Sequence, residues 1–297
     1  MKKIHLMAGI ILLAATACSN ESEQDVVNPG SQVPVTVHVD DFSMSVEDFP
    51  GPVTRTLQTV DSYEGVKAIT LAFYDAGGSQ VSKSTQLRAD NTTFTTFGQF
   101  ELSLRMGSYT MVVLGYGSVD AMTLTNMSNA TFDSDRVRET FIYTQAVNVT
   151  STAALEINAT LSRVVAKLEV RSSDNRTANA AKLRTTFAAG GDGVNPLTGL
   201  STTNTGFSNT VELSTAVGAE AGSANYLFLN TDQQSMTVNI DVLDADDNSV
   251  SHKVVNNVPL QRNKVTRLSG HLFTADDVTA AFQIETAWLG DVTTVEF

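Results

Sequence analysis

The chain has 297 residues, of which 42% are hydrophobic and 17% charged, so it is long and apolar enough to bury one large or two modest cores. Its 19 basic residues against 32 acidic ones give a formal net charge of −13 with no basic stripe, which argues against a nucleic acid partner. The few charges and the many Thr, Ser, Asn and Val residues favour short strands over a helical bundle.

The first 17 residues have the layout of a secretory signal peptide. Lys2 and Lys3 form a positive start, an apolar run of about ten residues follows, and Ala15-Thr16-Ala17 is a small-residue cleavage site. The apolar run is too short to span a bilayer. We therefore expect residues 1–17 to be removed during export.

The chain's one cysteine, Cys18, directly follows this site, where lipoprotein processing acylates a thiol. Residues 18–32 are polar, acidic and turn-rich, as a tether between a lipid and a folded body would be. Ser19 resembles the sorting signal of outer-membrane lipoproteins. We expect Cys18 to be lipidated and to anchor the protein in the outer membrane.

After the tether, apolar residues recur with a period of two, which predicts a strand with one buried face. The residues on that face are Val33, Val35, Val37 and Val39. Pro34 favours an edge position for this strand. The alternation shifts by one residue in 42–46, which predicts a β-bulge or a break around Asp40 and Asp41. Residues 50–56, including Arg55, are expected to form a loop.

Two hairpins are expected next. Residues 69–73 and a return strand from Val81 flank a turn with two glycines, and residues 100–106 and 109–114 flank Gly107 and Ser108. Residues 115–140 lose the alternation, which indicates a short helix or a long loop.

The second half alternates in the same style, although no exact internal repeat is visible. The Gly/Asn/Thr-rich residues 190–209 are expected to form a long surface loop. The other expected strands are residues 141–149, 155–161, 164–170, 226–229, 236–242, 250–254 and 282–288. Since no helical periodicity alternates with them, the sequence predicts an all-β protein of two antiparallel β-sandwich domains in tandem, residues 33–161 and 162–297.

The sequence does not support an enzyme, a cofactor or a metal site. It has no paired cysteines, no zinc-binding histidine pair and no nucleophile-elbow serine. The acidic run of residues 244–248 lacks the spacing of a calcium loop and is better explained as a hairpin turn. Trp288 would serve as a sugar-stacking platform, an exposed anchor or a core residue, and its alternation with Phe282 and Ile284 favours the core.

Several segments together resemble the fimbrillin family, the pilins of type V pili. They follow the lipidation cysteine and the acidic tether in the family's order and extend over nearly the whole mature chain. The segments are residues 35–37, Thr54-Arg55, residues 66–74, residues 107–114, residues 161–168 and residues 258–266.

This resemblance implies two transthyretin-like domains and assembly with other fimbrial subunits by head-to-tail strand addition. In that scheme a protease cuts after Arg55 and removes the valine-bearing strand of residues 33–39, and a donor strand from the next subunit replaces it. The candidate donor residues are Phe282, Ile284 and Trp288. Such a joint does not close on itself, so it builds a filament. Anchor subunits of the family keep the lipid and the first strand, whereas shaft and tip subunits lose both.

Two other functions are compatible with a lipid-anchored β-sandwich. A surface glycan-binding lipoprotein would present several exposed aromatic residues on one face. A hydrolase would need two carboxylates in one cleft, whereas the acids of this sequence cluster in turns. A fimbrial subunit that contacts host or bacterial surface ligands is the favoured function.

Overall fold

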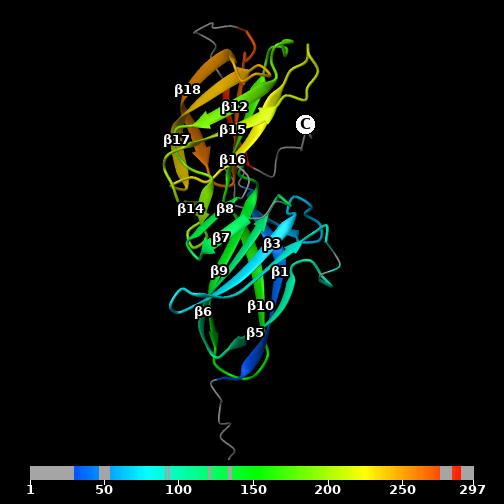
Figure 1. The fold of residues 1–297 in the computed structure, drawn as a ribbon, viewed down its shortest axis with the longest axis vertical. Coiled ribbons are helices and arrows are strands. Elements are labelled where there is room, and N and C mark those ends of the chain that lie inside the picture. Colours follow the sequence, from blue (N-terminus) through cyan, green and yellow to red (C-terminus); the bar gives the residue numbers. More distant parts are fainter. Residues whose placement is uncertain are drawn as a thin grey trace, which may run out of the picture.

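The computed structural model of the chain describes residues 30–46, 54–90, 92, 94–119, 122–132, 136–274 and 283–288. Within them lie twenty β-strands and no helix, so the all-β prediction is confirmed. This part of the chain accordingly offers no helix with the length and apolar character needed to cross a bilayer. Figure 1 shows an elongated molecule in which two β-rich parts are stacked along the long axis.

The first part folds around one hydrophobic core. Its strands are β1 (Gln32–Val46), β2 (Thr54–Thr59), β3 (Ala68–Asp75), β4 (Gln80–Leu87), β5 (Gln99–Arg105), β6 (Gly107–Tyr116), β9 (Thr140–Val149) and β10 (Leu155–Arg163). The sheet folds over where β9 meets β10, so that β4-β3-β6-β9 and β5-β1-β10 face each other across the core. Apolar residues on alternate positions of both layers fill the space between them.

The second part is a sandwich of two four-stranded sheets around a separate core. Its strands are β11 (Ala166–Ser172), β12 (Lys182–Phe187), β15 (Phe207–Glu212), β16 (Gly222–Leu227), β17 (Gln233–Leu243), β18 (Ser249–Gln261), β19 (Lys264–Gly270) and β20 (Gln283–Trp288). One sheet has the order β15-β12-β17-β18 and the other β16-β11-β19-β20. The expected β17–β18 hairpin is present, and its turn is held by Asp244, whose Oδ1 accepts hydrogen bonds from the backbone N–H groups of Asp246 and Asn248.

The two parts repeat one strand topology that the sequence does not reveal. In chain order, β1, β3, β4, β5, β6, β9 and β10 correspond to β11, β12, β15, β16, β17, β18 and β19. In each part the first strand lies between an antiparallel neighbour, β5 or β16, and a parallel one, β10 or β19. The sequence predicts purely antiparallel sheets. This is wrong, because β1 pairs in parallel with β10, and β11 pairs in parallel with β19. A parallel pair requires a long connection, and here the rest of each part supplies it.

A third core joins the two parts. The strands β7 (Met122–Asn126), β8 (Asn129–Phe132), β13 (Gly193–Asn195) and β14 (Leu200–Ser201) form one sheet in the order β14-β13-β8-β7, so each part contributes one hairpin. Tyr116 and Phe132 from the first part and Val194 and Phe228 from the second are buried in this core. The expected helix or long loop in residues 115–140 is therefore wrong, because part of that segment forms the β7–β8 hairpin.

Residues 190–209 do not form the expected surface loop. Val194 is fully buried, and β13 and β14 lie in the sheet that joins the two parts, whereas residues 202–205 are exposed. The glycines that suggested a loop allow neighbouring atoms to approach the backbone closely. Gly199 has a φ of +70°, and a Cβ added to it would lie 2.8 Å from Cγ1 of Val164.

The expected hairpin of residues 100–114 is also wrong. β5 pairs with β1, whereas β6 pairs with β3 and β9. Only Met106 separates β5 from β6, which is too short for a reversal, so the chain passes from one layer to the other at this corner. Tyr109 holds the corner by donating its hydroxyl hydrogen to the carbonyl of Arg105 at 2.9 Å. The hairpin between β3 and β4 is confirmed.

Candidate functional site

The first strand of the sandwich, β1, fills the core of the first part with the four predicted valines. Val33, Val35, Val37 and Val39 are each at most 4% exposed and belong to one cluster with side chains from β5 and β10. Burial of each valine contributes on the order of 1.5–3 kcal/mol, before the entropic cost of ordering the strand. The strand is therefore a main contributor to this core.

The backbone of β1 pairs along both edges. It is antiparallel to β5 from Gln32 to His38 and parallel to β10 from Val35 onward. Within the described residues, β5 and β2 have no strand partner other than β1. The edge position predicted from Pro34 is wrong. The proline is accommodated because it precedes the ladder with β10, which begins at Val35.

The predicted β-bulge is confirmed, since the register with β10 shifts between Val39 and Asp41. The shift brings the opposite set of residues to the inner face, and Phe42 becomes fully buried. Its ring centroid lies 4.9 Å from that of Phe141 and 5.9 Å from that of Tyr63. Phe42 of β1 thus packs into an aromatic cluster with Tyr63 and Phe141.

An ion pair lies against this aromatic cluster. Nη2 of Arg163 is 2.7 Å from Oε1 of Glu139, with the two side chains 1% and 11% exposed. The Tyr63 hydroxyl donates to Oε2 of Glu139 at 2.6 Å. Burial and the charge of Glu139 raise the pKa of Tyr63, so the phenol keeps the proton it donates. Arg163 also donates to Oδ1 of Asn263, in the turn between β18 and β19, at 3.0 Å. The aromatic cluster around β1 is therefore linked to the second part.

The other predicted site residues are placed as follows. Arg55 lies in β2, opposite Ser45 of β1, and not in a loop, because residues 54–59 pair in antiparallel register with residues 41–46 of β1. Cys18 and Phe282 lie outside the described residues. Ile284 and Trp288 belong to β20, an edge strand that pairs with β19 of the same chain.

The sequence did not point to the buried or half-buried polar residues that join the parts, Glu139, Arg163 and Asn263. A signal was available, since Arg163 takes the inward position that follows Leu155, Ile157, Ala159 and Leu161 in the alternation, and Asn263 lies in residues 258–266, another segment of fimbrillin resemblance. The sequence also did not point to Asp174. The carboxylate of Asp174 accepts backbone hydrogen bonds from Leu272, Phe273 and Thr274 at 2.7–2.9 Å. Burial opposes ionisation, but these hydrogen bonds outweigh it and lower the pKa of Asp174.

The part of the chain that the structure describes has no group of three or more His, Cys, Asp or Glu side chains placed to hold a metal ion. The arrangement around β1 consists of side-chain packing and of backbone pairing between strands.

Several solved structures share this fold. A candidate adhesin from Bacteroides ovatus has 12% sequence identity and a TM-score of 0.51, and the match covers 88% of this chain and 97% of that one. Another from Bacteroides ovatus ATCC 8483 has 10% identity and a TM-score of 0.50 and covers 82% and 88%. The fimbrial anchor protein Mfa2 from Porphyromonas gingivalis has 11% identity and a TM-score of 0.48 and covers 87% and 98%. At these identities the likeness to the two candidate adhesins shows the fold alone.

No curated protein sequence matches the chain. One family model does, and it extends over residues 31–296, which include both β-rich parts and the β1 strand. The chain therefore belongs to a family of unknown function, DUF6562.

Proposed function

We propose that the protein is a structural and adhesive subunit of a bacterial surface fimbria, exported as a lipoprotein and anchored to outer-membrane lipid through Cys18. The observation that carries this proposal is the pairing of β1, the only strand partner of β5 in the described residues and the source of four core valines. A strand of the same pattern from a neighbouring subunit would restore both the backbone pairing and the core. The fold shared with two candidate adhesins supports the proposal.

Within this proposal the chain has two transthyretin-like domains, residues 33–161 and 162–297, and is fimbrillin-like. The repeated strand order and the separate cores support the division. The β7–β8 and β13–β14 hairpins then form the contact between the domains.

Arg55 is the proposed processing site. It lies in β2, whose strand pairing in the described residues is with β1 alone. A protease would therefore act on an edge strand that has separated from β1. Cutting there would leave β5 unpaired and open a groove between β5 and β10 lined by residues such as Leu104 and Ile157. An unprocessed copy would keep β1 and act as the anchor.

The proposed donor is the C-terminal segment with Phe282, Ile284 and Trp288. Its described strand, β20, lies at the edge of a sheet and pairs with β19. To leave its own domain, β20 would therefore have to break only the backbone hydrogen bonds to β19. The next subunit would then receive it in the groove vacated by β1.

A disulfide that fixes β1 to β5 tests the exchange. Thr36 and Glu101 are directly opposite each other, and Thr36 alternates with the buried valines, so a Thr36→Cys/Glu101→Cys pair reacts outside the core. We expect this pair to prevent fibre formation under oxidising conditions and a reductant to restore it. The matched control is Thr186→Cys/Ser208→Cys, which joins β12 to β15 and leaves β1 free. Normal fibre formation with β1 fixed would refute strand exchange.

A further inference from the structure

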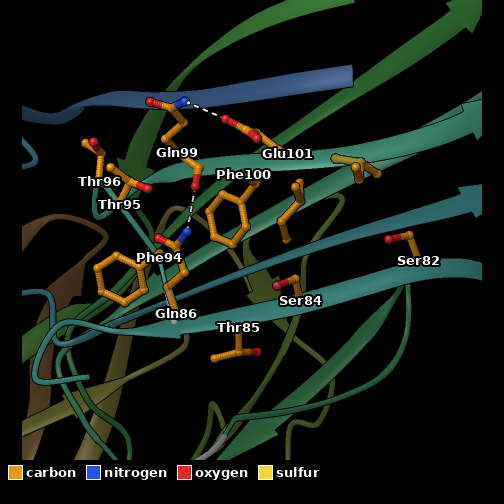
Figure 2. A pocket seen from close by; sticks show the side chains of 12 residues that line it. Ser82, Ser84, Thr85, Gln86, Phe94, Thr95, Thr96, Gln99, Phe100 and Glu101 are labelled. Atoms are coloured by element: carbon orange, nitrogen blue, oxygen red, sulfur yellow. Dashed lines mark hydrogen bonds between the residues drawn. The ribbon is translucent and has the colours of Figure 1, made fainter. Parts of the chain in front are cut away.

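A cleft opens on the side of the first part, between β4 of one layer and β5 of the other. Its volume is about 330 Å³, at the lower end of small-molecule sites. Figure 2 shows side chains from both strands and from the segment before β5 around this space. β4 pairs only with β3, and β5 only with β1, among the strands described, so the edges that border the cleft are not covered by another strand.

The second part also has a polar contact between the strands that correspond to β4 and β5. Its equivalent strands, β15 and β16, are joined by a hydrogen bond from Nδ2 of Asn209 to Oδ1 of Asn225 at 2.6 Å. The two asparagines are 6% and 1% exposed, so in each part a buried amide side chain links the edge strands of the two layers.

The inner end of the cleft is held in a fixed geometry by Gln86, which is 6% exposed. Its Nε2 donates to the carbonyl of Gln99 at 2.6 Å, and its Oε1 accepts from the backbone N–H of Gly98 at 2.8 Å. Figure 2 shows the first of these bonds crossing from β4 to β5. Because both ends of the amide are used, the cleft does not need to reorganise around Gln86 when it is occupied.

The lining chemistry fits a neutral, hydroxyl-rich ligand. Ser82, Ser84 and Gln99 offer hydroxyl and amide groups that both donate and accept hydrogen bonds. Phe94 offers an aromatic surface, and its ring is positioned by Phe97, with 5.8 Å between the centroids. Among the described residues that line the cleft, Glu101 alone is charged, so nothing there favours an anion.

We propose that the cleft between β4 and β5 binds a neutral saccharide, with one or two sugar rings placed against Phe94 and hydrogen-bonded to the hydroxyl and amide groups. An added peptide strand fits less well, because β4 lines the cleft with the polar side chains of Ser82, Ser84, Thr85 and Gln86, which suit hydroxyl groups better than alternate apolar side chains. This binding site goes beyond the proposed fimbrial role and does not depend on the exchange of β1.

Saturation-transfer NMR on the full-length protein tests this proposal, with maltotriose, cellotriose, mannotriose and triacetylchitotriose as probes. We expect at least one to bind with a dissociation constant of about 5 mM or tighter. Ser84→Trp places a large side chain in the cleft from an exposed position and should weaken that binding at least about tenfold. Thr210→Trp, at an exposed position of the equivalent strand β15, should leave it unchanged.

Glu101→Gln distinguishes a neutral sugar from a cationic ligand, since it removes the one charge and keeps the shape. Sugar binding should persist within about threefold in this variant. The proposal is overturned if no probe binds, if Ser84→Trp and Thr210→Trp bind equally well, or if the cleft instead takes up an extended peptide in a competition experiment.

Discussion

Arg163 donates a hydrogen bond to the side-chain oxygen of Asn263 at 3.0 Å, although the two residues are 100 positions apart. Arg163 ends β10, and Asn263 occupies the turn between β18 and β19 with a φ of +62°. The backbone N–H of Asn263 also donates to the carbonyl of Val165 at 2.8 Å. Residues 161–168 and 258–266, two of the six segments of fimbrillin resemblance, therefore meet at the junction of the two parts.

The junction predicts strong coupling between these residues. Arg163→Met should lower the free energy of unfolding by about 3–5 kcal/mol, because it leaves Glu139 buried without its cation. Asn263→Gly keeps the positive φ and should cost about 1–3 kcal/mol. In a double-mutant cycle measured by urea denaturation, we expect a coupling energy on the order of 1–2 kcal/mol. Additive losses would mean that the two side chains act independently.

Packing between the parts should make Gly199 sensitive to substitution. Gly199→Ala introduces a Cβ at 2.8 Å from Val164 in addition to backbone strain, so we expect a loss of about 3 kcal/mol or more in unfolding free energy. Gly218→Ala is the matched control, because Gly218 has a φ of +87° and open space around it, and should cost only about 1–2 kcal/mol. Equal losses of unfolding free energy in the two variants would show that backbone strain alone, and not the contact with Val164, determines the effect.

The core position of β1 predicts a large effect for Val37→Ala. Val37 is fully buried, and the loss of two methyl groups plus a cavity should cost about 2–3 kcal/mol. Val254→Ala changes a valine that is 51% exposed and should alter the unfolding free energy by less than about 0.5 kcal/mol. Similar midpoints for the two variants in urea would contradict the assigned role of β1.

Asp174 should make the segment of residues 272–274 dependent on pH. The pKa of Asp174 is lowered in the folded state, so its stabilising contribution is complete above the unfolded value of about 4 and disappears as the pH falls through the folded value. The stability difference between wild type and Asp174→Asn should therefore be constant from about pH 5 to 7 and shrink below about pH 4. Hydrogen exchange of the backbone amides of Leu272, Phe273 and Thr274, recorded at each pH, would measure this stability difference.

The exposed Asp192 provides the control for that experiment, and Asp192→Asn should not alter exchange in residues 272–274. A difference between wild type and Asp174→Asn that stays constant down to pH 2 would contradict the role of the ionised carboxylate.

Local periodicity was sufficient to predict the valine-bearing strand and its bulge, because both depend on which face of a short segment is apolar. It could not identify the partners of β5 and β6, since those pairings join distant segments. The repeated topology was also hidden, because the two parts share an arrangement of strands rather than residues. Among the site residues, the sequence indicated the strand of Val33 to Val39 but not the junction around Arg163, whose significance depends on Glu139 and Asn263 being brought together.

The most direct test of the fimbrial proposal is the N-terminus and intact mass of the protein recovered from outer membranes and from sheared surface fibres. The proposal predicts chains that begin with a lipid-modified Cys18 in the membranes and chains that begin at Thr56 in the fibres. A protein that is absent from the fibres and carries no lipid at Cys18 would contradict it.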